Sequence, residues 1–181
     1  MNITMKKILI FLIIITNTKC NSISSSIDKN LLSTTSEGEK ILLGKINHDQ
    51  LIYFSQDWFL KKYKPMDSKI LLELAPIVIN IKIKIFMGTW CEDSKREIPI
   101  LFDILKSIDY DLSSIEIISM SENKTTLEKF EKGLNITNIP TFIFYKNNIE
   151  LNRIVEFPLE TLEKDVFKIL STDDYKHAYF Q

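Results

Sequence analysis

Alternating apolar and polar positions give the clearest strand signal in the chain. Residues 79–86 place isoleucine at every second position, and lysine fills two of the positions between. This period-two pattern predicts a β-strand with one buried face. Apolar residues then recur with the helical period at Ile98, Leu101, Phe102 and Leu105. We therefore expect an amphipathic helix over about residues 92–107.

Shorter patterns predict the elements on either side. Before this strand we expect a strand over residues 41–46, a helix from a cap at Asp49 to about residue 63, and a short helix over residues 68–74. After the amphipathic helix we expect a strand over residues 112–120, a short helix over 125–132, two strands joined by a turn at Asn147-Asn148, and a helix over about 159–170 opened by Pro158. The resulting order is βαβαβαββα, an α/β arrangement.

Length, charge and composition narrow the class of protein. At 181 residues the natural prior is one domain. A net charge of −1 gives no electrostatic case for a nucleic-acid partner. The hydrophobic fraction of 45% suits a globular core.

The first 20 residues have the pattern of a targeting segment. Lys6 and Lys7 precede an apolar run at residues 8–15, which is too short for a bilayer span of about 20 residues. Cys20 follows, as in a bacterial lipoprotein signal, where such a cysteine becomes the lipidated first residue; Lys19 departs from the small residues usual there. Plain secretion and an uncleaved anchor are the alternatives. All three place the domain outside the cytoplasm.

The segment after this signal is polar and rich in serine and threonine. Residues 21–39 lack the apolar side chains that a core needs, so we expect a flexible tether. The folded domain is expected over residues 40–171. Residues 172–181 are expected to form a polar, frayed tail.

A cysteine lies where the alternating strand passes into the amphipathic helix. Cys91 is expected at the start of that helix, beside unpaired backbone N–H groups and the positive end of the helix dipole. Both favour the thiolate, which is the reactive form of cysteine. Ser94 follows one turn later, where its hydroxyl could donate a hydrogen bond to the sulfur.

This stretch resembles the active site of the thioredoxin superfamily. The family pattern is Trp-Cys-x-x-Cys, then Lys, then a proline that kinks the helix. Trp90, Cys91, Lys95 and Pro99 match it in order and spacing. Ser94 occupies the second-cysteine position, so the motif is a Cys-x-x-Ser variant.

A second motif strengthens the resemblance. Ile139-Pro140-Thr141 precedes an apolar strand, as in the family's second signature, where the proline is cis and faces the active-site cysteine. The resemblance implies that Trp90, Ile139 and Pro140 shape a docking surface for a peptide. It also implies a thioredoxin-like fold, with a central mixed β-sheet, the first three strands parallel, the last two a hairpin, and helices on both faces.

Two departures from the family bear on mechanism. Ser94 cannot close an internal disulfide with Cys91, so a dithiol reductase cycle would lack its second thiol. Thioredoxins also bury an aspartate beneath the active site, and the matching position here is Ile85. Both departures point to a single-thiol mechanism.

Two functional hypotheses follow. In the first, Cys91 and Ser94 form the catalytic site of an extracytoplasmic, membrane-anchored thiol–disulfide oxidoreductase or isomerase. Its partners are protein disulfides or mixed disulfides with small thiols, and an external thiol reductant recycles it. In the second, the domain is a redox-inactive binding module. We expect no cofactor, because no pattern for one is present.

The two histidines suggest no further chemistry. His48 and His177 lie far apart in the sequence, and no second domain cysteine supports a metal site with them. A hydrolase pair of Cys91 with His177 is formally possible. We expect His177 to be a solvated side chain in the polar tail.

Overall fold

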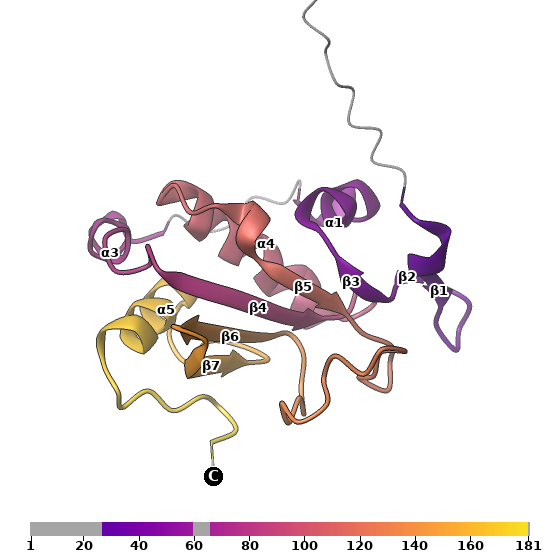
Figure 1. Cartoon of the computed structure of the whole chain (residues 1–181). Helices are drawn as coiled ribbons and strands as arrows, with labels where there is room; N and C mark the ends of the chain where they lie inside the picture. The colour runs from indigo at the N-terminus through magenta and orange to yellow at the C-terminus, as the bar shows by residue number, and fades with distance from the viewer. Residues whose placement is uncertain (1–26, 60–65, 181) are drawn as a thin grey trace, which may run out of the picture.

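The computed structural model describes residues 27–59 and 66–180 of the chain. Figure 1 shows a mixed sheet with helices above it and at its left-hand end, and a long loop below it. The helices and strands are η1 (Lys29–Leu31), β1 (Leu32–Thr34), β2 (Lys40–Leu42), β3 (Gly44–Ile46), α1 (His48–Phe54), α2 (Gln56–Phe59), α3 (Ser68–Leu74), β4 (Ile81–Met87), α4 (Glu92–Ser107), η2 (Leu112–Ser114), β5 (Glu116–Ser119), β6 (Thr141–Lys146), β7 (Ile149–Val155) and α5 (Leu162–Ser171).

The central sheet has five strands in the order β3-β5-β4-β6-β7. Only β4 and β5 run parallel; β3 pairs antiparallel with β5, and β6 pairs antiparallel with both β4 and β7. The mixed sheet is confirmed, but the expectation that the first three strands run parallel is wrong. A strand as short as β3 buries the same alternate positions whichever way it runs, so its sequence does not reveal its direction.

The N-terminal part of the domain is a small sheet of its own. The strand expected over residues 41–46 is split at Leu43 into β2 and β3, because Gly44, the first residue of β3, has φ +97°. β2 pairs with β1, which lies in the segment expected to be a tether. Regular structure therefore begins before the expected domain start at residue 40, while residues 21–26 lie outside the described part.

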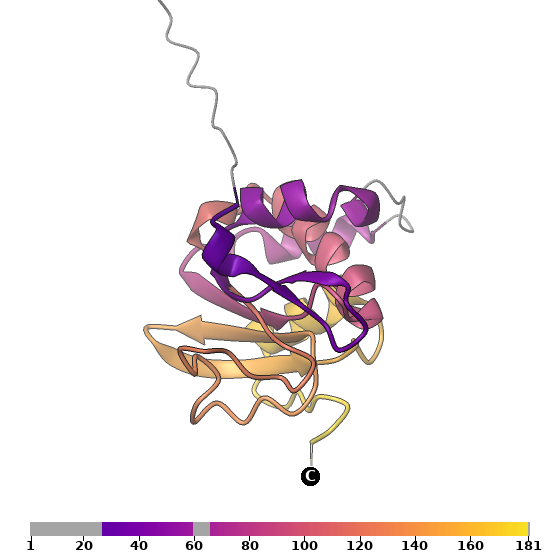
Figure 2. The ribbon, with the colours of Figure 1, turned by 90° about the vertical axis from the view of Figure 1, so that its right-hand side faces the viewer.

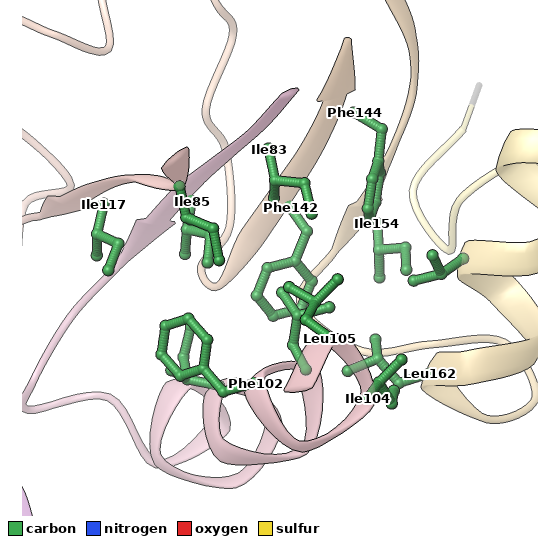
Figure 3. Packing of buried hydrophobic residues seen from close by; sticks show 14 of the residues in the cluster. Ile83, Ile85, Phe102, Ile104, Leu105, Ile117, Phe142, Phe144, Ile154 and Leu162 are labelled. Atoms are coloured by element: carbon green, nitrogen blue, oxygen red, sulfur yellow. The ribbon is translucent and has the colours of Figure 1, made fainter. Parts of the chain in front are cut away.

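All five described α-helices pack on one face of the sheet. Every second residue of β4, from Ile81 to Met87, points into a core with side chains of these helices. Figure 3 shows Phe142 and Ile154 on neighbouring strands pointing toward α4 and α5. The resemblance implied helices on both faces of the sheet. In the described residues the helices cover one face only, so that expectation is wrong.

The other face is covered by a loop. Phe86, Ile118 and Ile143 form a smaller apolar cluster with side chains of residues 130–136. Figures 1 and 2 both show residues 121–138 on the side of the sheet away from α1 and α4. The helix expected over residues 125–132 is wrong: the whole segment is described and consists of turns and irregular structure.

Local backbone geometry explains why that helix is absent. Lys124, Lys129 and Asn135 have φ between 51° and 56°, which a right-handed helix does not contain. The Thr126 hydroxyl accepts a hydrogen bond from the Phe130 N–H at 2.9 Å, which closes a turn in place of a helical bond.

Two helix starts differ from those expected. α1 is capped by Asn47 rather than Asp49, and Asn47 forms a reciprocal capping box with Gln50. α5 begins at Leu162 rather than near Pro158, since the Asp165 carboxylate holds the N–H groups of the preceding turn. α4 has the bounds that the sequence predicted.

The C-terminal segment, residues 172–180, is not a frayed tail. Tyr175 is only 3% exposed, and its hydroxyl donates to the Asp165 carboxylate at 2.7 Å. Burial and this bond raise the pKa of Tyr175. The Asn152 side chain of β7 also donates to the Tyr175 carbonyl. An aromatic residue that packs on α5 and β7 thus anchors a segment whose composition is mostly polar.

Candidate active site

Cys91 lies at the end of the sheet where β4 passes into α4. It is the N-cap residue of α4 and its side chain makes no capping bond. The residue is half-buried, and its thiol is free. The Sγ atom lies 3.4 Å from the Ile139 carbonyl oxygen, to which the thiol donates. The structure thus brings together two predicted site residues that are 48 positions apart in the chain.

Ser94 lies deeper than Cys91. Its side chain is fully buried, and its hydroxyl accepts a hydrogen bond from the Gly88 N–H at 3.2 Å. The Ser94 hydroxyl bonds the Gly88 N–H, and the Cys91 thiol bonds the Ile139 carbonyl, so neither bond links Ser94 to the sulfur. The expected hydrogen bond between them is therefore not formed, and Ser94 instead ties the first turn of α4 to the end of β4.

The Trp90 indole is held at the end of the sheet beside Cys91. Its Nε1–H donates to the Met120 carbonyl at 2.9 Å, which fixes the ring next to the end of β5. Both Trp90 and Cys91 pack against the apolar cluster on the loop-covered face. The ring orientation thus depends on that face rather than on the helices.

Gly88 is a site residue that the sequence motif did not identify. A Cβ atom there would lie 2.6 Å from Trp90 Nε1 and 3.1 Å from Ile139 Cδ1. Only glycine leaves room for the indole at this position. Its place two residues before Trp90 was a possible signal, but the need for space is visible only with the ring in position.

The N-terminal hairpin also holds the active-site turn. The Thr89 hydroxyl accepts a hydrogen bond from the Leu42 N–H at 3.1 Å, and the Leu42 carbonyl accepts one from the Ser119 hydroxyl at 2.7 Å. Thr89 is buried, so these bonds are shielded from water. Sequence reasoning missed this contact, because nothing local links residues so far apart.

The proline loop, residues 138–140, forms the wall opposite α4. The Ile139–Pro140 peptide bond is cis. The Thr141 hydroxyl donates to the Asn138 carbonyl at 2.6 Å, and the Pro140 carbonyl accepts from the Glu156 N–H at 2.7 Å. The loop is therefore tied both to its own strand and to the end of β7.

The charged residues at the start of α4, just after Cys91, form ion pairs with one another. Lys95 bonds Glu92 at 2.6 Å, as residues three apart on a helix do. Arg96 bonds both Asp93 and Glu97 at 2.7 Å. Burial raises the pKa of Glu97, although the guanidinium opposes that shift. These pairs offset part of the negative charge that the sequence places beside Cys91.

Ile85 is the residue that the resemblance matches to the family's buried acid. Ile85 is fully buried in the helix-covered core. Among the buried residues of α4, Glu97 is the one with an acidic side chain. The proton-handling aspartate of thioredoxins thus has no counterpart at residue 85.

The remaining candidates take no part in this cluster. His48 packs edge-on against Phe102 at 4.9 Å and contacts Asp49. His177 is partly buried rather than solvated, and burial lowers its pKa. Among residues 27–59 and 66–180, no group of three potential metal ligands occurs. Cys20 and the predicted signal lie outside the described residues.

Comparison with known proteins assigns the family. A family model described as "Thioredoxin" matches residues 55–168, which include both motifs. The chain therefore belongs to the thioredoxin superfamily. The resemblance and the thioredoxin-like fold are confirmed, and such a domain suggests a redox function.

Several solved structures are also similar. A protein of unknown function from Pseudomonas aeruginosa is 17% identical, with a TM-score of 0.42, over 66% of this chain and 80% of that chain. An HIV epitope scaffold gives the same identity and TM-score, over 66% of this chain and 81% of the scaffold. Oxidized thioredoxin O2 from Arabidopsis thaliana is 16% identical, with a TM-score of 0.33, over 49% and 75%. No curated protein matches the chain.

Proposed function

We propose that the protein carries out thiol–disulfide exchange with Cys91 as its single nucleophile. The observation that carries the proposal is the half-exposed Cys91 thiol at the start of α4, 3.4 Å from the Ile139 carbonyl beside Pro140. The N–H groups and the dipole at a helix start stabilise a thiolate. The proline loop supplies backbone next to the sulfur, where an extended peptide could pair.

The exchange proceeds in two balanced steps. The Cys91 thiolate attacks one sulfur of a substrate disulfide, a new disulfide forms to Cys91, and the other substrate sulfur leaves as a thiolate. A second thiolate then attacks the sulfur that is bonded to Cys91, and Cys91 leaves as a thiolate. When the attacking thiolate belongs to the substrate, a new substrate disulfide forms and the substrate's disulfides are rearranged. When Cys91 has instead taken the small-thiol sulfur of a mixed disulfide, a second molecule of that small thiol attacks it and departs as the symmetric small-thiol disulfide, so the substrate is left as a free thiol.

Ser94 supports this choice over a dithiol cycle. Its hydroxyl, buried and bonded to the Gly88 N–H, has the place of the family's second cysteine but cannot resolve a mixed disulfide. The adduct on Cys91 must therefore wait for an external thiol. The catalytic roles of Cys91 and Ser94 and the docking roles of Trp90, Ile139 and Pro140 stay predictions.

The decisive experiment detects the mixed disulfide on Cys91, which persists until an external thiol releases it. Incubated with a peptide–glutathione mixed disulfide, the native protein should accumulate a Cys91 adduct visible by mass spectrometry, and added glutathione should release it. Cys91→Ala should form no adduct. Ser94→Cys should instead close an internal disulfide and gain insulin reductase activity.

A second candidate function is a binding module without turnover. The absence of a second thiol in the motif and the apolar Ile85 beneath it favour this reading. If native protein forms no adduct and Ser94→Cys closes no disulfide, exchange is wrong and the binding module stands.

We further propose that the domain works outside the cytoplasm on a lipid anchor at Cys20. The support is the short apolar run that precedes this cysteine. No helix of the described residues is long and apolar enough to cross a membrane. Cys20→Ala should move the protein from the membrane fraction to the soluble fraction; retention in the membrane would favour an uncleaved anchor.

A further inference from the structure

Glu156 has an unusual backbone at the end of β7. Its φ is +68°, in the left-handed region that favours glycine. Its N–H donates to the Pro140 carbonyl at 2.7 Å. A glutamate with this backbone, bonded to the proline loop, is the kind of outlier that gathers at functional sites.

The side chain of Glu156 joins two segments that are distant in sequence. One carboxylate oxygen accepts a hydrogen bond from the Asn138 amide at 2.9 Å, which holds the start of the proline loop. The same oxygen accepts from the Tyr179 hydroxyl in the C-terminal segment. The carboxylate therefore connects the loop beside Cys91 to the end of the chain.

Tyr179 lies beside the proline loop, because its hydroxyl donates to the Glu156 carboxylate that also accepts from Asn138. Its hydrogen bond to Glu156 raises the pKa of the phenol, and the negative charge of Asp93 adds to that shift. Asp93 is two residues beyond Cys91. The Tyr179 ring also meets the Phe157 ring edge-on at 6.2 Å.

The C-terminal segment that carries Tyr179 lies beyond the residues that the family model matches. The family match ends at residue 168, and Tyr175 anchors the following residues on α5 and β7. Three rings in this region remain substantially exposed: Phe157 at 40%, Tyr179 at 43% and Phe180 at 55%. An ordered segment with exposed rings at the edge of the site is suited to contact whatever reaches Cys91.

We propose that Glu156 is a positioning residue, which latches the C-terminal segment to the proline loop so that both contact an incoming disulfide-bearing peptide. This role rests on the proposed thiol exchange. Glu156 itself does not touch the reacting sulfurs; it acts through Asn138, Pro140 and Tyr179. We call its bond with Tyr179 the Glu156–Tyr179 latch. Loss of the latch should weaken peptide binding without changing the intrinsic reaction of the thiol.

The test separates binding from chemistry. With a peptide–glutathione mixed disulfide as substrate, Tyr179→Phe should raise KM about fivefold and leave kcat unchanged, as expected for one ordinary hydrogen bond that contributes equally to ground and transition states. Alkylation of Cys91 by iodoacetamide, which is too small to reach the segment, should stay unchanged. Tyr53→Phe is the matched control, because Tyr53 is similarly exposed at 54% but lies on α1.

Substitutions at Glu156 distinguish its side chain from its backbone. Glu156→Gly suits the positive φ and keeps the N–H bond to Pro140 but removes the carboxylate, so it should raise KM as Tyr179→Phe does. Glu156→Gln keeps an acceptor for Tyr179 and should recover most of the lost affinity. If Glu156→Gly leaves KM unchanged, the positioning role is wrong.

Hydrogen exchange tests the latch without relying on activity. In Tyr179→Phe, the amides of Glu156 and Tyr179 should exchange faster than in native protein, since both lie in the joined segments. Faster exchange with an unchanged KM would make the latch structural only and overturn the positioning role. If native protein forms no Cys91 adduct, the proposed function fails; unchanged amide exchange would then show separately that the latch is wrong as well.

Discussion

The two faces of the central sheet are covered by different kinds of structure: helices on one face and a loop on the other. The helix-covered face packs Ile85 and Ile117 against five helices in one large core. The loop-covered face packs Phe86 and Ile118 against residues 121–138, and its cluster is small. Adjacent residues on β4 and β5 thus belong to different clusters.

This difference separates the residues that mainly stabilise the fold from those that pack beside the Cys91 thiol. Helices that pack with the sheet bury most of the apolar surface, which dominates the free energy of folding. Trp90 and Cys91, by contrast, pack against the smaller cluster beneath the loop. We therefore expect substitutions on the helix-covered face to act mainly on stability, and those on the loop-covered face to act on the thiol as well.

The largest expected effect is on the helix-covered face. Ile117→Ala removes a fully buried side chain that helices and neighbouring strands surround. Because such surroundings collapse little into a cavity, the free energy of unfolding should fall by about 4 kcal/mol. Urea denaturation measures this, and iodoacetamide labelling of the folded variant at Cys91 should match that of native protein.

The neighbouring residue provides the matched comparison. Ile118→Ala removes the same atoms from an equally buried position, but beneath the loop. A loop without helical bonds can settle into the cavity, so the cost should be about 2–3 kcal/mol. Labelling of Cys91 should change here. A larger cost than for Ile117→Ala, together with unchanged labelling, would contradict the division between the faces.

A smaller effect is expected from overpacking beside the thiol. In Gly88→Ala the added methyl group meets the Trp90 indole, so stability should fall by about 1–3 kcal/mol. The emission of Trp90 should also shift, measured in a Trp58→Phe background that leaves one tryptophan. Gly38→Ala, where a Cβ would meet nothing within 4 Å, should leave the emission unchanged.

The smallest effects are opposite pH dependences on the two faces. Burial raises the pKa of Glu97 on α4, so its contribution to stability is complete below its ordinary value near 4.5 and is lost as pH rises through the raised pKa. Burial also acts on Glu116, but bonds to Lys84 and Lys45 outweigh it and lower the pKa. Its contribution is present above 4.5 and is lost as pH falls through the lowered pKa.

Urea denaturation at several pH values between 3 and 7 would measure both. Relative to native protein, Glu97→Gln should gain stability as pH rises, and Glu116→Gln should gain it as pH falls. Each gain should be under about 1 kcal/mol, because the Arg96 guanidinium offsets part of the effect of burial on Glu97 and solvent screens Glu116. Two trends of the same sign would show that the pairing of these carboxylates is misassigned.

Sequence alone predicted the elements whose signal is local and long. The alternation in β4 and the helical period of α4 gave both elements nearly to the residue, except that Ile79, at 73% exposure, lies before β4. The Asn147-Asn148 turn is present with φ of 53° and 64°, as a hairpin turn of this kind requires. Each of these signals depends on neighbours within a few residues.

The candidate site divides in the same way. The motifs identified Trp90, Cys91 and Pro140, because the family fixes these residue types at fixed spacing. They did not identify Gly88 or Glu156, whose contacts join segments far apart in the chain. The assignment of Ser94 to the variant position of the motif stays a prediction, and its hydrogen bond to the Gly88 N–H was not predicted.

What the sequence by itself determined is therefore the pattern of strands and helices, the family, and a cysteine at a helix start. The tertiary structure decided the direction of β3, the single helix-covered face, and the C-terminal segment that reaches Glu156. Periodicity and capping act within a few residues of the chain, and the sequence records them directly. Strand direction, layer and side-chain partner depend on packing between distant segments, and many sequences with the same local pattern can satisfy it in different ways.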